Sequence, residues 1–294
     1  WTGGSEGVLP RSLGKKFFGR RNRLLQLSMV LFLLIAGETL TRLNNESSVL
    51  GFQLVIALAV GLRAFSIITQ YRILSTSRMP ARETGLKMRA QVRLIADNQP
   101  LVRFYLFGAT FGLMANFFGP FFNLYMYEGL NMSVSDVTML LVISNVTGAI
   151  ALPAWGQFLD RYGNRPTMAF ALIAWTAPGY AWALLNPDNA WLLKLLFASG
   201  GIFQAGFLLG QFNMLLKLVP PEAKTAAISL NLATTSLATA VAPIIGGILL
   251  DQAFARGFGT LEVYHGMALV HHTIVILSAL VLLRGPSRPR RCTR

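Results

Sequence analysis

The sequence predicts an all-α polytopic helical membrane protein with about eight transmembrane helices, and three observations predict this class. Of its 294 residues, 53% are hydrophobic and only 13% are charged, whereas an average soluble domain carries about 25% charged residues. The apolar residues gather in runs close to the ~20 residues that cross a bilayer. The net charge of +14 lies between those runs, so membrane topology explains it better than nucleic-acid binding, for which no fold motif is present.

Eight apolar segments are expected to span the membrane. They are Leu24–Leu43, Val49–Gln70, Phe104–Tyr127, Ser135–Leu159, Thr167–Leu185, Trp191–Leu216, Ala226–Leu250 and Tyr264–Leu283. A basic and partly amphipathic segment, Tyr71–Arg103, separates the second span from the third. We therefore expect 1–70 to hold two helices of a first bundle, 71–103 to link two bundles, and 104–294 to form a six-helix bundle with a basic tail.

The distribution of cations predicts the orientation. If the loops alternate from a cytoplasmic start, 22 of the 26 Lys and Arg residues lie on the cytoplasmic side. The opposite side holds Arg42, Lys194 and Arg256, and Arg63 lies inside a span. This asymmetry follows the positive-inside rule. Both ends of the chain are thus expected in the cytoplasm, and we expect a bacterial inner membrane.

A short polar loop, Gly156–Pro166, joins the fourth and fifth spans. A loop this tight needs glycine for unusual backbone angles and can use proline to begin the next helix. Asp160 and Arg161 lie where one helix ends and the next begins. There a carboxylate can cap a helix N-terminus or pair with a cation, so the loop has the composition of a latch.

Gly156, Asp160, Arg161, Gly163 and Arg165 match a Gly-x-x-x-Asp-Arg-x-Gly-x-Arg pattern. With its layout of two spans, a basic segment and six spans, the chain resembles the major facilitator superfamily. That family has twelve helices in two halves of six, so the resemblance implies an N-terminally truncated fragment covering approximately helices five to twelve. It also implies that the five matching residues form a cytoplasmic gate.

Uncharged polar residues within the spans are the candidates for a solute cavity. They are Asn116, Asn123, Asn145, Gln204, Gln211, Asn231 and Thr235. A lipid-facing amide would be unsatisfied, so these groups must face other helices or water. Hydrogen bonding between helices is the alternative. Spacings of seven residues, as between Asn116 and Asn123, favour one shared aqueous face.

Other features of the spans are less specific. Glu38 is expected at the membrane interface, with ion coupling as the alternative. Gly119-Pro120 is expected to break its helix, and the small residues of Ala226–Gly247 allow close helix packing. His265, His271 and His272 are expected to face the lipid interface or to pack. Those histidines and Cys292 lack the spacing of a metal site, and no cofactor is indicated.

The function predicted from these features is that of a secondary transporter, not an enzyme. It would move a small neutral or amphipathic organic solute, either a sugar-like compound or an effluxed drug, by alternating access. A coupling proton or sodium ion stays open, because no clear carboxylate lies within the spans. The partners expected are the solute and the lipid bilayer, with no nucleic acid, and the protein is expected to be a monomer. The alternatives are a non-transporting receptor or scaffold on the same fold and an intramembrane lipid-modifying enzyme.

Overall fold

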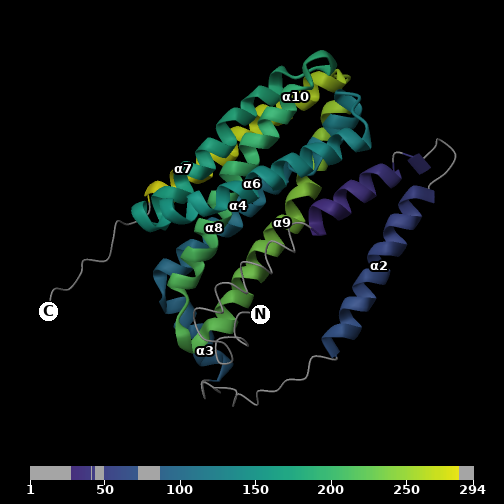
Figure 1. Ribbon diagram of the computed structural model, residues 1–294. Helices are drawn as coiled ribbons and strands as arrows, with labels where there is room; N and C mark the ends of the chain where they lie inside the picture. The colour runs from purple at the N-terminus through teal and green to yellow at the C-terminus, as the bar shows by residue number, and fades with distance from the viewer. Residues whose placement is uncertain (1–27, 41, 44–49, 72–86, 285–294) are drawn as a thin grey trace.

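The computed structural model describes residues 28–40, 42–43, 50–71 and 87–284, and these form helices joined by short turns (Figure 1). No strand occurs in that part of the chain, so the all-α class is confirmed. Six helices there are long and apolar enough to cross a membrane. They are Leu50–Thr69, Gln99–Gly129, Val134–Tyr162, Leu192–Leu218, Pro221–Ala255 and Thr260–Leu280.

Two of the eight expected spans have a different form. Of Leu24–Leu43, the structure describes the shorter apolar helix Ser28–Leu40 and the helical pair 42–43. The span expected at Thr167–Leu185 begins as helix α7 (Asn164–Thr176) and continues as the 3-10 helix η2 (Ala177–Leu184). Pro178 explains the change, because its ring blocks an α-helical hydrogen bond and restricts the residue before it.

The remaining elements follow in chain order. They are α2 (Leu50–Tyr71), α3 (Met88–Asp97), α4 (Gln99–Phe118), α5 (Phe121–Leu124), the π-helix η1 (Tyr125–Gly129), α6 (Val134–Tyr162), η3 (Pro187–Asn189), α8 (Leu192–Leu218), η4 (Pro221–Ala223), α9 (Lys224–Ala255) and α10 (Thr260–Arg284). The short elements α5 and η1 continue the course of α4 after an interruption at Gly119-Pro120. The helix break expected there is therefore present.

Local sequence accounts for the helix starts. Asn98 caps α4 by accepting from the backbone N–H of Leu101, so α4 begins earlier than the expected Phe104. Ser133 and Asp136 form a reciprocal capping box at the start of α6, with each side chain accepting from the other residue's backbone N–H. Such a box satisfies two N–H groups that the helix would otherwise leave free.

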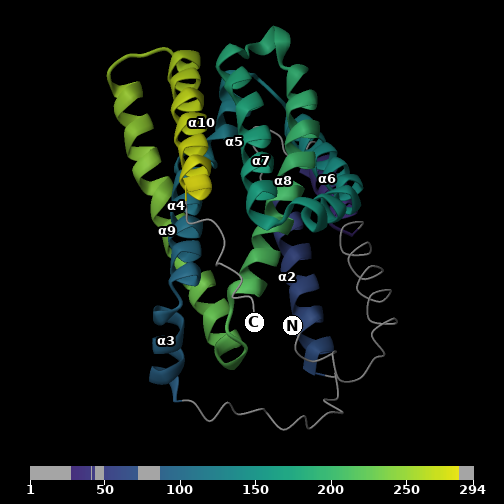
Figure 2. The same cartoon turned by 90° about the vertical axis from the view of Figure 1, so that its left-hand side faces the viewer.

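Helices α4 to α10 form one bundle with two packed groups. Helices α6 and α7 both pack along α8, and α4 packs along α9. Helix α10 joins the groups by contacting α4, α7 and η2. Figure 2 shows α4, α9 and α10 on one side and α6, α7 and α8 on the other.

The buried side chains of the bundle form two separate clusters. One, the motif-end core, includes Phe107, Met168 and Phe207 and lies toward the end of α6 that carries the loop motif. The other, the far-end core, includes Tyr125 and Tyr264 and lies toward the start of α6. Residues of both clusters therefore line the middle of the bundle.

The two helices that precede the bundle are less enclosed. A Cβ placed at Gly37 would lie 2.8 Å from Thr138 Cγ2, so the helix Ser28–Leu40 crosses α6 closely at that point. Helix α2 stands apart from the bundle in Figure 1, and its apolar side chains are exposed, with Ile56 at 61% and Phe65 at 65%. The expected linker at 71–103 is described only in part, where α3 is amphipathic and buries Ile95.

Candidate functional site

The loop motif is a tight turn between α6 and α7. Gly163 has φ = +84° and ψ = 167°, and its N–H donates to the Leu159 carbonyl at 2.9 Å. The Thr167 hydroxyl donates to the Gly163 carbonyl at 2.7 Å. Glycine adopts this positive φ without steric cost, whereas other residues would be strained. The geometry thus explains the glycine at position 163.

The charges of the motif project away from the turn. Asp160 and Arg161 are both exposed, and the Arg161 guanidinium lies 5.3 Å from the centroid of the Tyr162 ring. Asp160 makes no ion pair or hydrogen bond with any described residue. It does not cap α7, whose N-terminus has no side-chain cap. The Asp160 carboxylate is therefore available to bind a group outside the described bundle.

Two further parts of the motif differ in their surroundings. The Lys217 ammonium donates to Asn164 Oδ1 at 3.2 Å, which ties the loop to the end of α8. Arg165 is half-buried. A Cβ at Gly156 would meet no atom within 4 Å. The close helix contact that a glycine would permit at 156 is therefore not present in this conformation.

Two of the predicted cavity residues, Asn231 and Thr235, lie between α9 and α4. A Cβ at Gly108 would lie 3.3 Å from Thr235 Cγ2 and 4.0 Å from Asn231 Oδ1. The Thr235 hydroxyl donates to the Asn231 carbonyl at 2.8 Å, while Asn231 Oδ1 is buried without a partner. We call this contact the α4–α9 seam, and it is closed by small groups.

Four other candidates do not converge. Asn116 Nδ2 and Asn145 Nδ2 each donate to a carbonyl one turn earlier in their own helices. Asn123 is exposed and lies beyond the break at Gly119-Pro120. Gln211 is half-buried on α8. Two of these four side chains are therefore held by their own helices, and none of the four bonds to another.

Gln204 lines a space that the sequence did not predict. Two adjoining cavities of about 190 and 210 Å³ lie in the middle of the bundle and share Trp175, Trp182 and His272 as walls. We call the two together the inner cavity. Trp182 belongs to the far-end core, and Trp175 packs against the motif-end core. The inner cavity therefore lies between the two cores.

The 3-10 geometry of η2 shapes one wall of the inner cavity. A Cβ at Gly179 would lie 1.9 Å from His272 Nε2, so only glycine leaves room for this imidazole. His272 is 8% exposed, which corresponds to packing rather than to a lipid-facing position. Two features of the sequence could have indicated this wall: the pair His271-His272 within an apolar run, and the Pro178-Gly179 step in another run. The sequence did not show that Gly179 and His272 meet.

Carbonyl groups at the end of η2 are bonded by neighbouring elements. The Tyr125 hydroxyl lies 3.0 Å from the carbonyls of both Trp182 and Leu185. His265 Nε2 lies 2.8 Å from the Leu185 carbonyl. These bonds anchor the end of η2 to η1 and α10, because carbonyls at helix ends need external donors.

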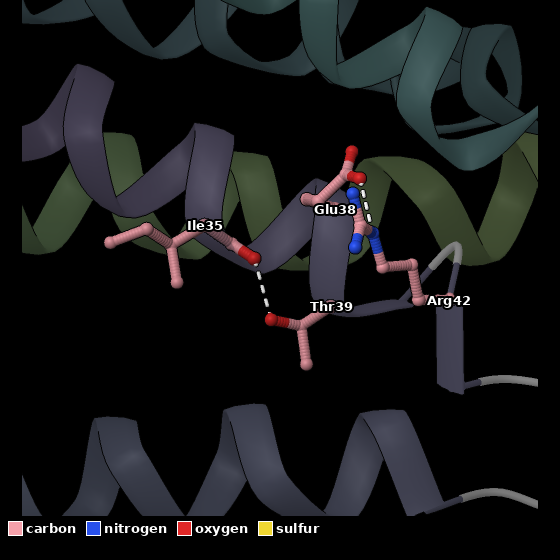
Figure 3. Close-up of polar contacts among 4 residues, drawn as sticks. All are labelled: Ile35, Glu38, Thr39 and Arg42. Carbon is pink, nitrogen blue, oxygen red and sulfur yellow. Dashed lines mark hydrogen bonds and ion pairs between the residues drawn. The ribbon is translucent and has the colours of Figure 1, made fainter.

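A larger groove lies at the far end of the bundle. It has a volume of about 650 Å³ and is lined by the helix Ser28–Leu40 and the starts of α6 and α8, with Glu38, Asp136 and Lys194 among its residues. Figure 3 shows Glu38 paired with Arg42 one turn later on its own helix. Glu38 is thus exposed and paired with a cation of its own helix. Among the described residues, no group of three or more His, Cys, Asp or Glu could hold a metal ion.

Comparisons with known proteins agree with this geometry. Residues 104–293 match the family model of the Major Facilitator Superfamily. The multi-drug resistance efflux pump PmrA of Streptococcus pneumoniae is 27% identical over 151 residues, in serotype 4 (strain ATCC BAA-334 / TIGR4) and in strain ATCC BAA-255 / R6 alike. The alignment covers 50% of this chain and 36% of the pump, so it spans about a third of that relative's length.

A solved structure shares the fold. The crystal structure of a bacterial homologue of the iron transporter ferroportin, in an inward-facing state, superposes with a TM-score of 0.68 at 15% identity. The superposition covers 96% of this chain and 65% of that one.

Proposed function

Because the chain belongs to the major facilitator superfamily, we propose that it works as a secondary transporter for a small neutral or amphipathic organic solute. The likeness to an efflux pump favours an exported, drug-like solute over a sugar. In this proposal the protein is a monomer in a bacterial inner membrane, with the loop motif and both chain ends in the cytoplasm. The coupling ion, a proton or sodium, stays open.

One observation carries the proposal of alternating access. The helix Ser28–Leu40 and α6 lie on opposite sides of the expected linker, and they meet closely where Gly37 faces Thr138. Next to that contact lies the groove of about 650 Å³. A narrow crossing beside an open groove suits two bundles that rock against each other about a site between them. On this basis 1–70 and 104–294 belong to separate moving bodies.

Cross-linking the crossing tests this proposal. The protein expressed from its complete coding sequence would carry Gly37→Cys and Thr138→Cys, with Cys292, the one cysteine of the chain, changed to Ser. A Cβ at Gly37 would lie 2.9 Å from Thr138 Cβ, closer than the ~3.8 Å of a disulfide, so the two helices need to separate only slightly for the bridge to form. We expect oxidation to slow ethidium efflux from cells at least about tenfold, and a reductant to restore it, because a locked crossing blocks one state of the cycle.

A matched pair within one bundle serves as the control. Gly108→Cys with Thr235→Cys joins α4 to α9, where a Cβ at Gly108 would lie 3.3 Å from Thr235 Cγ2, and oxidation there should leave efflux unchanged. If the oxidised Gly37–Thr138 pair transports ethidium as fast as the same pair treated with reductant, alternating access at this crossing is contradicted. Uptake of a labelled disaccharide in place of ethidium efflux would favour the sugar-like solute, and flux of neither probe would favour the receptor or scaffold.

The exposed acid of the loop motif supports a gate. Gly156, Asp160, Arg161, Gly163 and Arg165 would close the cytoplasmic side in the outward-facing state, with Asp160 accepting hydrogen bonds from the other bundle. A hydrogen bond to a charged group contributes about 1.5–3 kcal/mol. We therefore expect Asp160→Asn to slow ethidium efflux about tenfold without reducing the amount of protein in the membrane.

Asp188→Asn is the control for the gate. Asp188 is equally exposed but lies in η3, at the other end of the bundle. Efflux at the native rate by the Asp160→Asn variant would remove the gate assignment and leave the transporter proposal intact.

A further inference from the structure

Aromatic rings line the inner cavity. The Phe122 ring centroid lies 4.7 Å from that of Trp182, 5.0 Å from His271 and 5.6 Å from His272, each in an edge-on arrangement. Edge-to-face contacts at these separations are favourable for aromatic rings. A planar ring entering the cavity would meet both faces and edges of this kind.

The size of the cavity limits what it can hold. Its two parts measure about 190 and 210 Å³. An apolar protein cavity of about 150 Å³ stays dry and binds benzene. Each part of the inner cavity is therefore large enough for a ring system somewhat bigger than benzene, such as two fused rings.

The cavity also presents an unpaired hydrogen-bond acceptor. His272 Nδ1 lies 2.7 Å from the Ala268 carbonyl. A carbonyl only accepts, so Nδ1 carries the proton and Nε2 of the neutral ring is an acceptor. Nε2 is the ring atom nearest Gly179, which lines the same cavity, and none of the described residues bonds to it.

A second polar atom nearby is also unsatisfied. His271 Nδ1 is buried without a partner, and the two imidazole centroids are 5.0 Å apart. Leaving buried polar atoms unpaired is costly. A ligand that brings an N–H group would donate to the unpaired acceptor on His272.

The walls exclude a charged ligand. Among the described residues that line the inner cavity there is no Asp, Glu, Lys or Arg. Burying a charge without a partner is strongly unfavourable. From the size, the aromatic walls and the free acceptor, we propose that the inner cavity binds a neutral bicyclic aromatic molecule with a ring N–H, of which indole is the simplest example.

Direct binding to the purified full chain in detergent tests the proposal. Labelled indole would be measured by equilibrium dialysis, with 1-methylindole as the competitor that lacks the N–H donor. We expect saturable binding of indole and competition by 1-methylindole that is roughly fivefold weaker, which is the size of one hydrogen bond. Absence of saturable binding overturns the proposal.

A cavity-filling variant locates the ligand. A Cβ at Gly200 would lie 3.6 Å from Trp175, in ordinary contact, so the longer side chain of Gly200→Leu extends into the cavity. Gly266→Leu is the matched control, because a Cβ there meets nothing within 4 Å. We expect Gly200→Leu to lose indole binding and Gly266→Leu to keep it. A folded Gly200→Leu variant that binds as tightly as the control overturns the proposal.

His272→Phe decides the hydrogen bond even if Gly200→Leu does not fold. This variant keeps a ring in place and removes the acceptor. It should weaken indole binding roughly fivefold and leave 1-methylindole unchanged. Equal effects on both probes overturn the assignment of His272 as acceptor. The measurement is independent of transport, so a failure of the efflux tests above leaves it standing.

Discussion

Two contacts close the same bundle in opposite ways. One is the α4–α9 seam, and the other is the contact between η2 and α10, which we call the η2–α10 seam. In the α4–α9 seam, Gly108 and Gly246 admit methyl groups and backbone from the neighbouring helix. In the η2–α10 seam, large rings such as Tyr180 and His272 meet, and cavities lie beside them. Small residues thus give a continuous contact, while rigid aromatic groups leave unfilled volume.

The two seams also differ in their hydrogen bonds. The α4–α9 seam buries one amide oxygen, Asn231 Oδ1, without a partner. At the η2 end of the η2–α10 seam, His265 of α10 and Tyr125 of the neighbouring η1 bond to backbone carbonyls. Close packing therefore stabilises the first seam, and bonds between elements position the second.

The largest effect expected from breaking this contrast is at Gly246. A Cβ there would lie 1.8 Å from the Phe117 carbonyl oxygen, a backbone atom that cannot rotate away. Gly246→Ala must therefore displace α9 from α4, and we expect a loss of stability of at least about 1–3 kcal/mol. Thermal unfolding of the detergent-purified protein measures it.

Gly247→Ala is the neighbouring control. Its Cβ would approach the tip of the Phe121 ring at 3.2 Å, and a ring can turn slightly, so its melting temperature should fall less. Equal melting temperatures for the two variants would show that the α4–α9 seam tolerates added volume, contrary to the contrast drawn above.

Features that depend on local residue chemistry could be predicted from the sequence. The break after α4 follows from Gly119-Pro120, and the turn after α6 follows from Gly163, since each conformation is set by the residues that adopt it. The small residues of Ala226–Gly247 likewise indicated close packing, which Gly246 makes against α4.

Features that depend on long-range pairing could not be predicted. The inner cavity exists because Pro178 changes α7 into a 3-10 helix and because Gly179 then faces His272. A periodicity of seven residues carries no information on either event. Of the seven polar candidates, Gln204 is the one that lines this cavity. Asn116 and Asn145 bond within their own helices, and Asn231 and Thr235 lie in the α4–α9 seam. Asn123 is exposed, and Gln211 is half-buried on α8.

A smaller effect is expected at the η2–α10 seam. Tyr125→Phe removes the hydroxyl that lies 3.0 Å from the carbonyls of Trp182 and Leu185. Those carbonyls keep other partners, because the Leu185 N–H donates to Trp182 and His265 bonds Leu185. We therefore expect a loss of about 1 kcal/mol, the net contribution of one hydrogen bond, rather than the larger cost of an unsatisfied group.

Tyr127→Phe is the matched control, because Tyr127 lies on the same π-helix and its side chain is 38% exposed. Its melting temperature should stay at the native value while that of Tyr125→Phe falls by a few degrees.

Since Trp182 is a wall of the inner cavity, Tyr125→Phe should also weaken indole binding, whereas Gly246→Ala at the α4–α9 seam should lower stability without a specific loss of indole binding. If Tyr125→Phe and Tyr127→Phe melt together, bonds between elements do not position η2, and the contrast between the seams reduces to packing alone.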